Sequence, residues 1–470
     1  MEALPLGHSQ AGRRENQAAL ILTSCALGLL MVFLVYTGNF VFGSEAGKWV
    51  YGYRETPVAV PVWNLVVVFG LLAAAVLVGS RTIGTRERTT LLACWLAVLI
   101  VQVLIRDLAA VPLASIIESE GPNGFYSAAQ RYSPSEILSQ FEALLPSQKG
   151  HVQSNMPGKI MLFQLLGWLT PSPQLMGYLI IALSSAGSWL VYGISKRLFH
   201  DRLAAFYAFL LYAVVPCRLF FLPILNTVTP VFLLACLYLF LVHLQTKRAS
   251  TLWLLGVALY VLVLFEPSPL VTGIVFASLL GDSMLKKEIR TGELVRLLLI
   301  TVMAFAVVFL VFRLAFRFDL ADALRFVLND AVKFNLTAQR GYWRWMAENT
   351  KEFFYSSGAP AAFLLLYLGL HAMVNGAGLV RSLKTLPIES VVALSLITTF
   401  LVLVLLGINR GEVSRLWIYL AVLFQIPVAL FISRRRRSSI LFLLVVGTTA
   451  VQAIVAIQQV VFVLPATPAG

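Results

Sequence analysis

One stretch decides how the chain is organised. It runs from Arg106 to Lys159 and reads RDLAAVPLASIIESEGPNGFYSAAQRYSPSEILSQFEALLPSQKGHVQSNMPGK. It brings acids, arginines, tyrosines, amides and a histidine together, whereas the sequence before and after it consists of long apolar runs. Such a chain has few other segments whose side chains could carry out polar chemistry at a membrane surface. We therefore expect this stretch to be a loop outside the bilayer that carries the functional site.

The composition is that of a membrane protein. Hydrophobic residues make up 59% of the 470 residues, charged residues make up 12%, and the mean hydropathy is +0.84. A soluble domain is about 45–50% apolar and about 25% charged. The four cysteines lie inside apolar runs, so neither a disulfide framework nor a metal cluster is indicated. The expected fold class is an all-α polytopic membrane protein.

A bilayer span needs about 20 apolar residues, and fewer where neighbouring protein covers it. The apolar runs predict about thirteen spans, which form one transmembrane domain over residues 19–470 behind a cytoplasmic tail, residues 1–18. The spans are expected near residues 19–41, 59–79, 89–113, 174–195, 203–222, 228–246, 251–266, 268–282, 295–315, 359–377, 388–408, 416–433 and 438–463.

The net charge of +14 orients the protein and does not indicate a nucleic-acid partner. When the loops are assigned alternately to two sides, most of the excess positive charge falls on one side, which includes the run from Arg434 to Arg437. Basic loops of membrane proteins face the cytoplasm. Two long loops, residues 114–173 and 316–358, are then left on the non-cytoplasmic face.

Both long loops have features of surface segments. Residues Ser133 to Glu136 read SPSE, a capping box with proline at the first helical position, which predicts the start of a short helix. The apolar segment from Lys159 to Leu169 is about 11 residues long and too short to span, so we place it along the membrane surface. The second loop is rich in aromatic residues, which is typical of a membrane interface or a ligand lid.

Three acids at the start of the first long loop are the candidate catalytic residues. Asp107 follows Arg106 at the end of a span, where paired ionisable residues are costly and often functional. Glu120 stands before the run GPNG at 121–124, a turn-forming sequence that we expect to aim its side chain inward. Glu118 is expected to continue the helical end of the third span and to face water. The alternative interpretation of each acid is a solvated loop charge.

Several segments together resemble the GT-C superfamily of integral-membrane glycosyltransferases, which includes protein mannosyltransferases and aminoarabinose transferases. In that family a span ending on the outer face is followed by an acid, an aromatic-x-x-Ala segment, two surface helices and a His-Pro-Pro-Gly-like turn. The histidine is displaced here to His151, the acid is a glutamate, and two spans precede the one that should be first. The segments that carry the resemblance are Phe125 to Ala129, Asn155 to Gly158, Lys196 to Pro216, and Asn226 with Pro230.

The resemblance implies the reaction. An acceptor hydroxyl, on a glycan, lipid or protein, attacks the anomeric carbon of a sugar carried on a polyprenyl phosphate, with inversion at that carbon. A carboxylate takes the hydroxyl proton, and we expect Glu120 to do so ahead of Glu118 and Asp107. The sequence lacks a glycine-rich phosphate loop, which favours a lipid-linked donor from the bilayer. The expected location is the bacterial inner (plasma) membrane, with the active site on the outer face.

The departing phosphate needs positive charge, which arginine supplies through two parallel hydrogen bonds. The segment NRGEVSRLW at 409–417 lies outside between two spans, and it resembles a feature of some bacterial members of the superfamily. Arg410 and Arg415 are therefore the candidate phosphate ligands, and Glu412 lies three residues before Arg415, where the two side chains can hold each other. Alternatively, both arginines extend from helix ends toward the interface.

Other polar residues of the two loops are candidate substrate contacts. Glu266, before Pro267 at the end of a span, is suited to sugar hydroxyls, although a solvated tight turn is the alternative. Lone loop histidines such as His151 are more often solvated than functional. Arg218, Lys159, Arg340 and Arg344 are weaker candidates for the phosphate, and each is interpreted rather as an interfacial anchor. The complete set of candidate substrate-binding residues is Tyr126, Arg131, His151, Asn155, Lys159, Glu266, Arg344, Arg410, Glu412 and Arg415.

Two other classes of protein stay open at this point. A lipid-linked glycan ligase or polymerase of the O-antigen type also has a large outer loop with arginine and histidine. A transporter or lipid flippase would show an internal repeat and charges near the middle of the membrane; no repeat stands out in this sequence. No cofactor is required by the sequence and no protein-defined metal site is expected, apart from a loosely held divalent cation.

Overall fold

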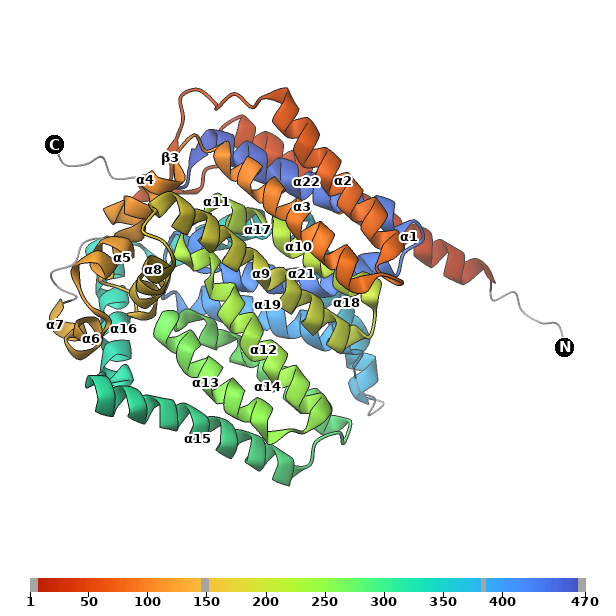
Figure 1. Ribbon diagram of the computed structural model, residues 1–470. Helices are drawn as coiled ribbons and strands as arrows, with labels where there is room; N and C mark the ends of the chain where they lie inside the picture. Colours follow the sequence, from red (N-terminus) through yellow and green to blue (C-terminus); the bar gives the residue numbers. More distant parts are fainter. Residues whose placement is uncertain (1–6, 145–151, 382–385, 464–470) are drawn as a thin grey trace.

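The computed structural model describes residues 7–144, 152–381 and 386–463, and this part of the chain is almost entirely helical (Figure 1). In the described residues, ten helical segments are long and apolar enough to cross a membrane, or eleven if one bent pair is counted as a span. The protein is an integral multi-pass membrane protein. The ten segments lie within α1 (Gly7–Tyr36), α2 (Val62–Thr82), α3 (Glu87–Asp107), α9 (Pro173–Phe199), α10 with α11 (Arg202–Val214, Pro216–Phe220), η3 with α12 (Leu225–Thr227, Thr229–Thr246), η4 with α14 (Ser268–Thr272, Gly273–Leu285), α15 (Thr291–Phe316), α19 (Ile388–Leu406) and α22 (Ser438–Gln459).

Each of the thirteen expected spans coincides with helical structure, but three do not stand alone as membrane-length helices. α13 (Ala249–Phe265) and α21 (Ile418–Ser433) are shorter than the rest. α18 (Ala359–Arg381) reaches span length and hydropathy only together with α17 (Tyr342–Ser356), from which it is bent by 111°. The expected count of thirteen spans is thus not reproduced by length and composition alone.

The first span begins close to the expected residue 19, because the candidate span within α1 is Gln17–Tyr36, and α1 extends back to Gly7. One expected boundary is wrong: the third span was expected to reach residue 113, yet α3 ends at Asp107. Pro112 disfavours helical backbone at Val111, and Ala110 adopts a left-handed conformation (φ 55°), so the helix cannot continue through this point. A separate short helix, α4 (Leu113–Glu118), follows.

The two long loops form helices at one end of the molecule, here called the loop end, where α4 to α8 and α16 gather in Figure 1. The predicted capping box is confirmed, because Ser133 accepts from Glu136 N and Glu136 accepts from Ser133 N at the start of α6. Ser154 Oγ donates to Asp330 Oδ2 over 2.5 Å and so joins the two loops. The loop-end helices besides α4 and α17 are α5 (Glu120–Arg131), α6 (Pro134–Ser139), α7 (Phe141–Leu144), α8 (Gly158–Leu169) and α16 (Leu320–Thr337).

Four two-residue strands also lie at the loop end. β1 (Gly43–Ser44) and β2 (Trp49–Val50) form an antiparallel hairpin between α1 and α2. β3 (Gly52–Tyr53) pairs with β4 (Val460–Val461), which directly follows α22. The connection between the first two spans is thereby tied to the end of the last one.

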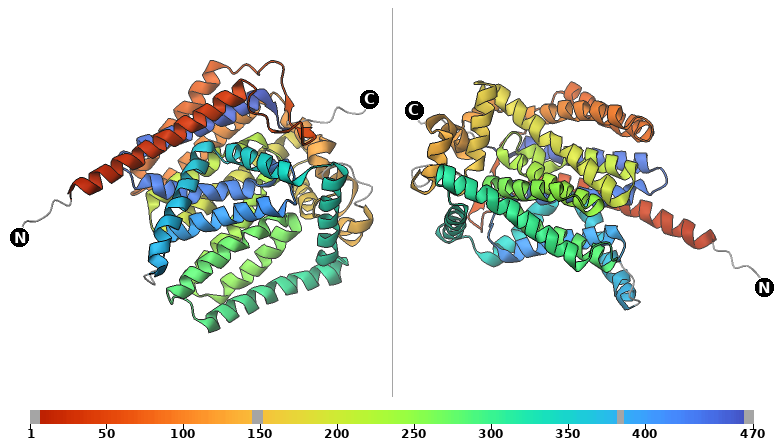
Figure 2. Two further views of the ribbon diagram at one scale, coloured as in Figure 1. Left: turned by 180° about the vertical axis from the view of Figure 1, so that it is seen from behind. Right: turned by 60° about the horizontal axis from the view of Figure 1, so that its bottom comes forward.

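The opposite end, here called the arginine end, joins loops that are distant in sequence. Lys196 Nζ lies 2.6 Å from Glu87 Oε1, and Arg434 Nη1 lies 2.6 Å from Glu389 Oε1. α1 extends beyond the other helices at this end, as the views of Figure 2 show. The run from Arg434 to Arg437 lies here, between α21 and α22.

α10 and α21 form the centre of the bundle. All of Ala204 to Val214 and all of Ile418 to Ile432 are buried, whereas α15 exposes large apolar side chains such as Leu298, Leu299 and Val302. Exposed apolar side chains on a peripheral helix suit contact with lipid, and a helix covered by protein on all sides does not need the full length of the hydrocarbon core. This explains why α21 is short.

At the break between α10 and α11, an arginine side chain satisfies backbone carbonyl groups that the helix leaves unpaired. Pro216 has no N–H to donate to Tyr212 O, so the end of α10 is left with unpaired carbonyl oxygens inside the bundle. Arg218 turns back and donates from Nε to Tyr212 O (3.2 Å) and from Nη2 to Ala213 O (2.9 Å), and Gln102 also donates to Ala213 O (3.0 Å). The interpretation of Arg218 as an interfacial anchor is wrong, because its side chain is fully buried.

Candidate functional site

A buried ion pair joins the first long loop to the end of α13. Lys159 Nζ lies 3.0 Å from Glu266 Oε2, with the two side chains 0% and 7% exposed. Lys159 also donates to Asn155 Oδ1 (2.8 Å) and lies over the rings of Phe125 and Phe265. Burial lowers the pKa of Lys159, and the carboxylate of Glu266 opposes this shift. Breaking a buried pair by removing one partner costs roughly 3–5 kcal/mol, so the two residues depend on each other.

Gly158 brings Lys159 to this position. The start of α8 approaches the end of α13 so closely that a Cβ on Gly158 would lie 2.6 Å from Leu264 O and 2.7 Å from the Cα of Phe265. Only glycine allows two backbones to approach in this way. The turn that resembles the family motif therefore sets the geometry of the ion pair.

The carboxylate of Glu266 is the acceptor for three further side chains. Thr229 Oγ1 donates to Oε2 over 2.6 Å and Asn226 Nδ2 over 3.3 Å, while Ser268 Oγ donates to Oε1 over 2.9 Å. Thr229 and Asn226 lie where η3 meets α12, so broken helices converge on this carboxylate. Glu266 is thus a buried and fully bonded group, and its interpretation as a solvated turn is wrong.

Asn226 connects this pair to a second one. Its Oδ1 accepts from Arg415 Nη1 over 3.4 Å, and Arg415 Nη2 lies 2.6 Å from Glu412 Oε2. Burial acts to lower the pKa of Arg415, but the carboxylate of Glu412 outweighs it and the pKa is raised. The predicted contact between Glu412 and Arg415 is confirmed, on the short helix α20 (Val413–Leu416) and the residue before it.

The backbone before α20 is held in an uncommon conformation. Gly411 and Glu412 both have positive φ angles, 93° and 58°. A side chain at 411 would meet Trp345 and Arg340, with a Cβ 3.0 Å and 3.1 Å from their nearest atoms. For Glu412, which is not glycine, the left-handed conformation costs of order 1–3 kcal/mol. Backbone strain of this kind is concentrated at functional sites, where the surrounding structure maintains it.

Arg340, in the second long loop, is the last charged residue that reaches these ion pairs. Its guanidinium lies near the rings of Trp49, Phe334 and Trp345, at 5.3, 4.8 and 5.5 Å from their centroids, and its Nη2 is 3.9 Å from Glu412 Oε1. Burial lowers the pKa of Arg340, while Glu412 opposes the shift. Its side chain is 6% exposed, so its interpretation as an interfacial anchor is wrong.

These residues form one chain of contacts at the loop end, which we call the buried charge network. It contains more positive than negative groups and draws on both long loops and on the ends of α12, α13 and α21. The network consists of Lys159, Glu266, Asn226, Arg415, Glu412 and Arg340.

The three candidate bases lie outside the network. Glu120 is about half exposed and lies 3.4 Å from Arg131 on the same helix, and Asp107 is paired with Arg106 at 3.0 Å. Glu118 is the exposed last residue of α4. The expected turn at 121–124 is found only in part, because α5 joins two helical pieces across a break at Asn123, where φ and ψ are −136° and 35°. The expected inward direction of Glu120 is wrong, because its side chain is 44% exposed. Glu118 also does not continue the third span, since α4 is a separate helix.

α5 nevertheless connects the acids to the network. Phe125, on this helix, contacts the ammonium group of Lys159, and the next residue, Tyr126, packs against Phe163 of α8 with ring centroids 5.7 Å apart. The charge of Glu118 acts on the hydroxyl of Tyr126 and, after burial, is the second cause that raises the pKa of this tyrosine.

Of the other candidate residues predicted from the sequence, some contact the network and others do not. Arg410 donates to the backbone oxygens of Gly407 and Arg340, over 3.1 and 2.6 Å, and so fastens two loops to each other. Arg344 is exposed and pairs with Glu348 at 3.1 Å, away from Glu412. Asn155 is part of the Lys159 contact, whereas His151 lies outside the described residues.

Two residues carried little signal in the sequence. Asn226, in the network, is indicated only by the family resemblance, and Glu352, beside the network, belongs to no motif. Glu352 is fully buried and accepts from the backbone N–H of Ser414, beside Arg415, over 2.9 Å. In an amphipathic segment such as YWRWMAENTKEFFYS, the sequence alone does not tell a buried glutamate from a solvated one. The position of the helix in the fold is needed for that.

No group of three or more histidine, cysteine, aspartate or glutamate side chains within residues 7–144, 152–381 and 386–463 is arranged to hold a metal ion. The four cysteines are free and buried. No protein-family model matches this chain, and none of the curated proteins compared with it gives a significant match.

Proposed function

We propose that the protein is an integral-membrane glycosyltransferase of the GT-C type, which transfers a sugar from a polyprenyl-phosphate donor to an acceptor hydroxyl on the non-cytoplasmic face. The loop end is then the outer face, in agreement with the positive charge at the arginine end. The proposal rests on the resemblance of the motifs in both loops and on the buried charge network.

The network is the observation that carries the proposal. Burying charged groups is expensive, and replacing buried ion pairs by apolar residues often stabilises a protein. Ionisable residues that are retained in buried positions of a membrane protein therefore favour a functional site. Here they gather where both long loops and several broken helices meet, which is where a lipid-linked donor and a water-soluble acceptor are both within reach.

The charges of the network suit a phosphate leaving group. Lys159, Arg340 and Arg415 outnumber Glu266 and Glu412. Arg415 is the central cation, between Asn226 and Glu412, and its planar guanidinium can hold two phosphate oxygens. Arg410 holds two loops together, because its N–H groups donate to backbone oxygens of Gly407 and Arg340. We therefore assign the donor phosphate to Arg415 rather than to Arg410.

The acids next to the network supply the base in this proposal. A carboxylate of α4 or α5 takes the proton of the acceptor hydroxyl as the oxygen attacks the anomeric carbon, and the bond to the phosphate oxygen breaks on the opposite face. Glu120, Glu118 and Asp107 all have access to water, as an acid that must meet an incoming acceptor requires. Proton transfer of this kind contributes roughly 10²–10⁴ in rate.

The test uses purified protein in nanodiscs with a labelled polyprenyl-phosphate sugar. Arg415→Ala should weaken donor binding by about 1.5–3 kcal/mol, the value of hydrogen bonds to a charged group, and Arg415→Lys should recover only part of this. Arg410→Ala is the matched control and should bind the donor nearly as the parent does. Equal donor affinity in the parent and both Arg415 variants would contradict the assignment.

The same assay separates the alternatives. A ligase or polymerase of the O-antigen type would release label only from a diphosphate-linked glycan, and a flippase would move the labelled lipid between leaflets without breaking the sugar–phosphate bond. Transfer of the sugar from a monophosphate donor is expected.

A further inference from the structure

A buried carboxyl group next to the network has no ion-pair partner. Glu352 lies on α17, its side chain is 0% exposed, and its Oε1 accepts from the backbone N–H of Ser414 over 2.9 Å. Among the residues that the structure describes, its Oε2 has no hydrogen-bond partner and the carboxyl group forms no ion pair. Glu348 on the same helix, in contrast, is paired with Arg344 at 3.1 Å and with Lys351.

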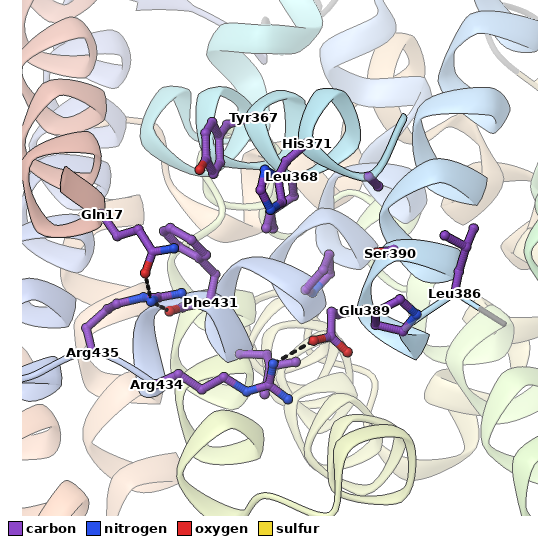
Figure 3. A pocket seen from close by; sticks show the side chains of 14 residues that line it. Gln17, Tyr367, Leu368, His371, Leu386, Glu389, Ser390, Phe431, Arg434 and Arg435 are labelled. Carbon is purple, nitrogen blue, oxygen red and sulfur yellow. Dashed lines mark hydrogen bonds and ion pairs between the residues drawn. The ribbon is translucent and has the colours of Figure 1, made fainter. Parts of the chain in front are cut away.

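A carboxylate at the arginine end shows the usual arrangement. Glu389 lines a cavity of about 220 Å³ there and pairs with Arg434 at 2.6 Å (Figure 3). Glu352 is buried and has no such cation within the described part of the chain. A carboxyl group that loses its water without gaining a cation keeps its proton, because burial disfavours the charged form. Burial accordingly raises the pKa of Glu352 to about 7, while the N–H of Ser414 opposes this shift and the charge of Glu412 adds to it.

Two further buried polar atoms of this region lack a hydrogen-bond partner in the described residues. They are Oη of Tyr51 and Nε of Arg340. Burial raises the pKa of Tyr51, and four charges also act on its hydroxyl, so these charges lie around one place. They are the charges of Glu352, Glu412, Arg415 and Arg340. When Glu352 is ionised, its charge is therefore added to the site at which Glu412 pairs with Arg415.

Charged and titratable groups approach Glu352 from its own helix, from the segment before α2, from the connection between α16 and α17, and from α20 with the residue before it. They are Lys351, Tyr51, Tyr53, Arg340, Glu412 and Arg415. Three more helices, α11, α18 and α19, pack against α17. Arg218 of α11 donates to α9 and α10 instead, and the titratable residues of α18 and α19 lie toward the arginine end.

We propose that Glu352 is a proton-binding residue of the donor site, which holds a proton at neutral pH and weakens the binding of a lipid phosphate at Arg415 when it loses that proton. In the protonated state the carboxyl group accepts from Ser414 N and holds the start of α20 without adding charge. In the ionised state it places a second negative charge near Glu412, which repels an incoming phosphate. Glu352 acts through its neighbours and is a positioning residue. The proton on Glu352 is independent of the proposed transferase activity, whereas its link to the lipid phosphate rests on that proposal.

The proton and the donor are coupled in both directions. If protonation of Glu352 strengthens phosphate binding by some factor, phosphate binding strengthens protonation by the same factor. The phosphodiester of the donor keeps one negative charge in the neutral pH range, so the pH dependence comes from the protein. We therefore expect the donor to bind roughly fivefold or more weakly at about pH 8.5 than at about pH 6.

The first test is infrared difference spectroscopy of the full chain in nanodiscs, which detects the carbonyl band of a protonated carboxylic acid. The parent should lose such a band between about pH 6 and about pH 8.5. Glu352→Gln should lack it, because the amide keeps the acceptor for Ser414 N but has no proton to lose. Glu348→Gln on the same helix is the matched control and should keep it, because Glu348 is ion-paired. The same band in the parent and in Glu352→Gln, or no pH-dependent band in the parent, would overturn the proposal.

The second test measures the affinity for the labelled polyprenyl-phosphate sugar over the same pH range. Glu352→Gln should bind it within about twofold at both ends of the range, whereas the parent and Glu348→Gln should keep the pH dependence. An equal pH dependence in the parent and in Glu352→Gln would exclude the link to the donor. A pH-dependent band in a parent that binds no donor at any pH would contradict the proposed function together with this link, and would still establish the proton on Glu352.

Discussion

The three candidate bases differ in what surrounds each carboxylate. Arg131 lies 3.4 Å from Glu120, Arg106 lies 3.0 Å from Asp107, and Glu118 ends a short helix close to Tyr126. An exposed pair such as Glu120 with Arg131 is worth little in free energy, so an incoming acceptor can displace it. The role of Glu120 as the base stays a prediction.

We expect Glu120→Gln to lower turnover roughly 10²-fold or more and to leave donor affinity nearly unchanged, because the amide keeps the size of the side chain but cannot accept a proton. The same change at Glu118 should have a milder effect. The measurement is single-turnover transfer with saturating donor. Normal turnover of Glu120→Gln together with inactive Glu118→Gln or Asp107→Asn would move the base to another acid. Activity in all three would exclude an acid of this loop.

The position of the helix α8 depends on the absence of a side chain at Gly158. Gly158→Ala would place a Cβ 2.6 Å from Leu264 O, so the start of α8 would have to move away from α13 and separate Lys159 from Glu266. We expect a lower thermal unfolding midpoint and loss of transfer. Gly167→Ala is the control on the same helix, because its Cβ would meet only Met176, at 4.0 Å. Equal midpoints and activities for the two variants would contradict the role of the close approach.

The break between α10 and α11 gives a second prediction for an element. Arg218→Met keeps the volume but leaves Tyr212 O without its donor inside the bundle, at a cost of roughly 1–3 kcal/mol. The unfolding midpoint should fall accordingly. Arg325→Met, at an exposed ion pair of α16, should leave it unchanged. A parent-like midpoint in Arg218→Met would mean that water satisfies the carbonyl instead.

For the whole molecule, hydropathy was sufficient to locate the long apolar helices and insufficient to find the buried charge network. A run of about 20 apolar residues is a local property, so α2, α15 and α22 could be located from composition alone. Arg340 and Asn226, in contrast, reach the network through partners 70 or more residues away, such as Glu412 and Arg415. The predicted end of the third span failed because the apolar run continues past Asp107, where α3 ends, into the separate helix α4.

Orientation is the prediction that belongs to the whole chain. Single cysteines at Lys247 or Arg436, at the arginine end, should be shielded from an impermeant thiol reagent in intact cells, and a cysteine at the exposed Lys333 should be labelled. The four native cysteines are buried and should give little background. Labelling in the opposite sense would reverse the protein in the membrane and place the loop end in the cytoplasm.

The pairing of β3 with β4, and the packing of α1 against α22, have a consequence for biogenesis. Gly28 of α1 lies against Thr448 of α22 and Pro360 of α18, so α1 has partners, α22 among them, that are made long after it. The two are about 400 residues apart, and at about 5–20 residues per second α1 waits on the order of 20–80 s before α22 is made. During that interval lipid or an insertion factor must shield its apolar face. The pairing of β3 with β4 likewise forms only after α22 has been made, so the connection between α1 and α2 stays without this partner throughout that interval.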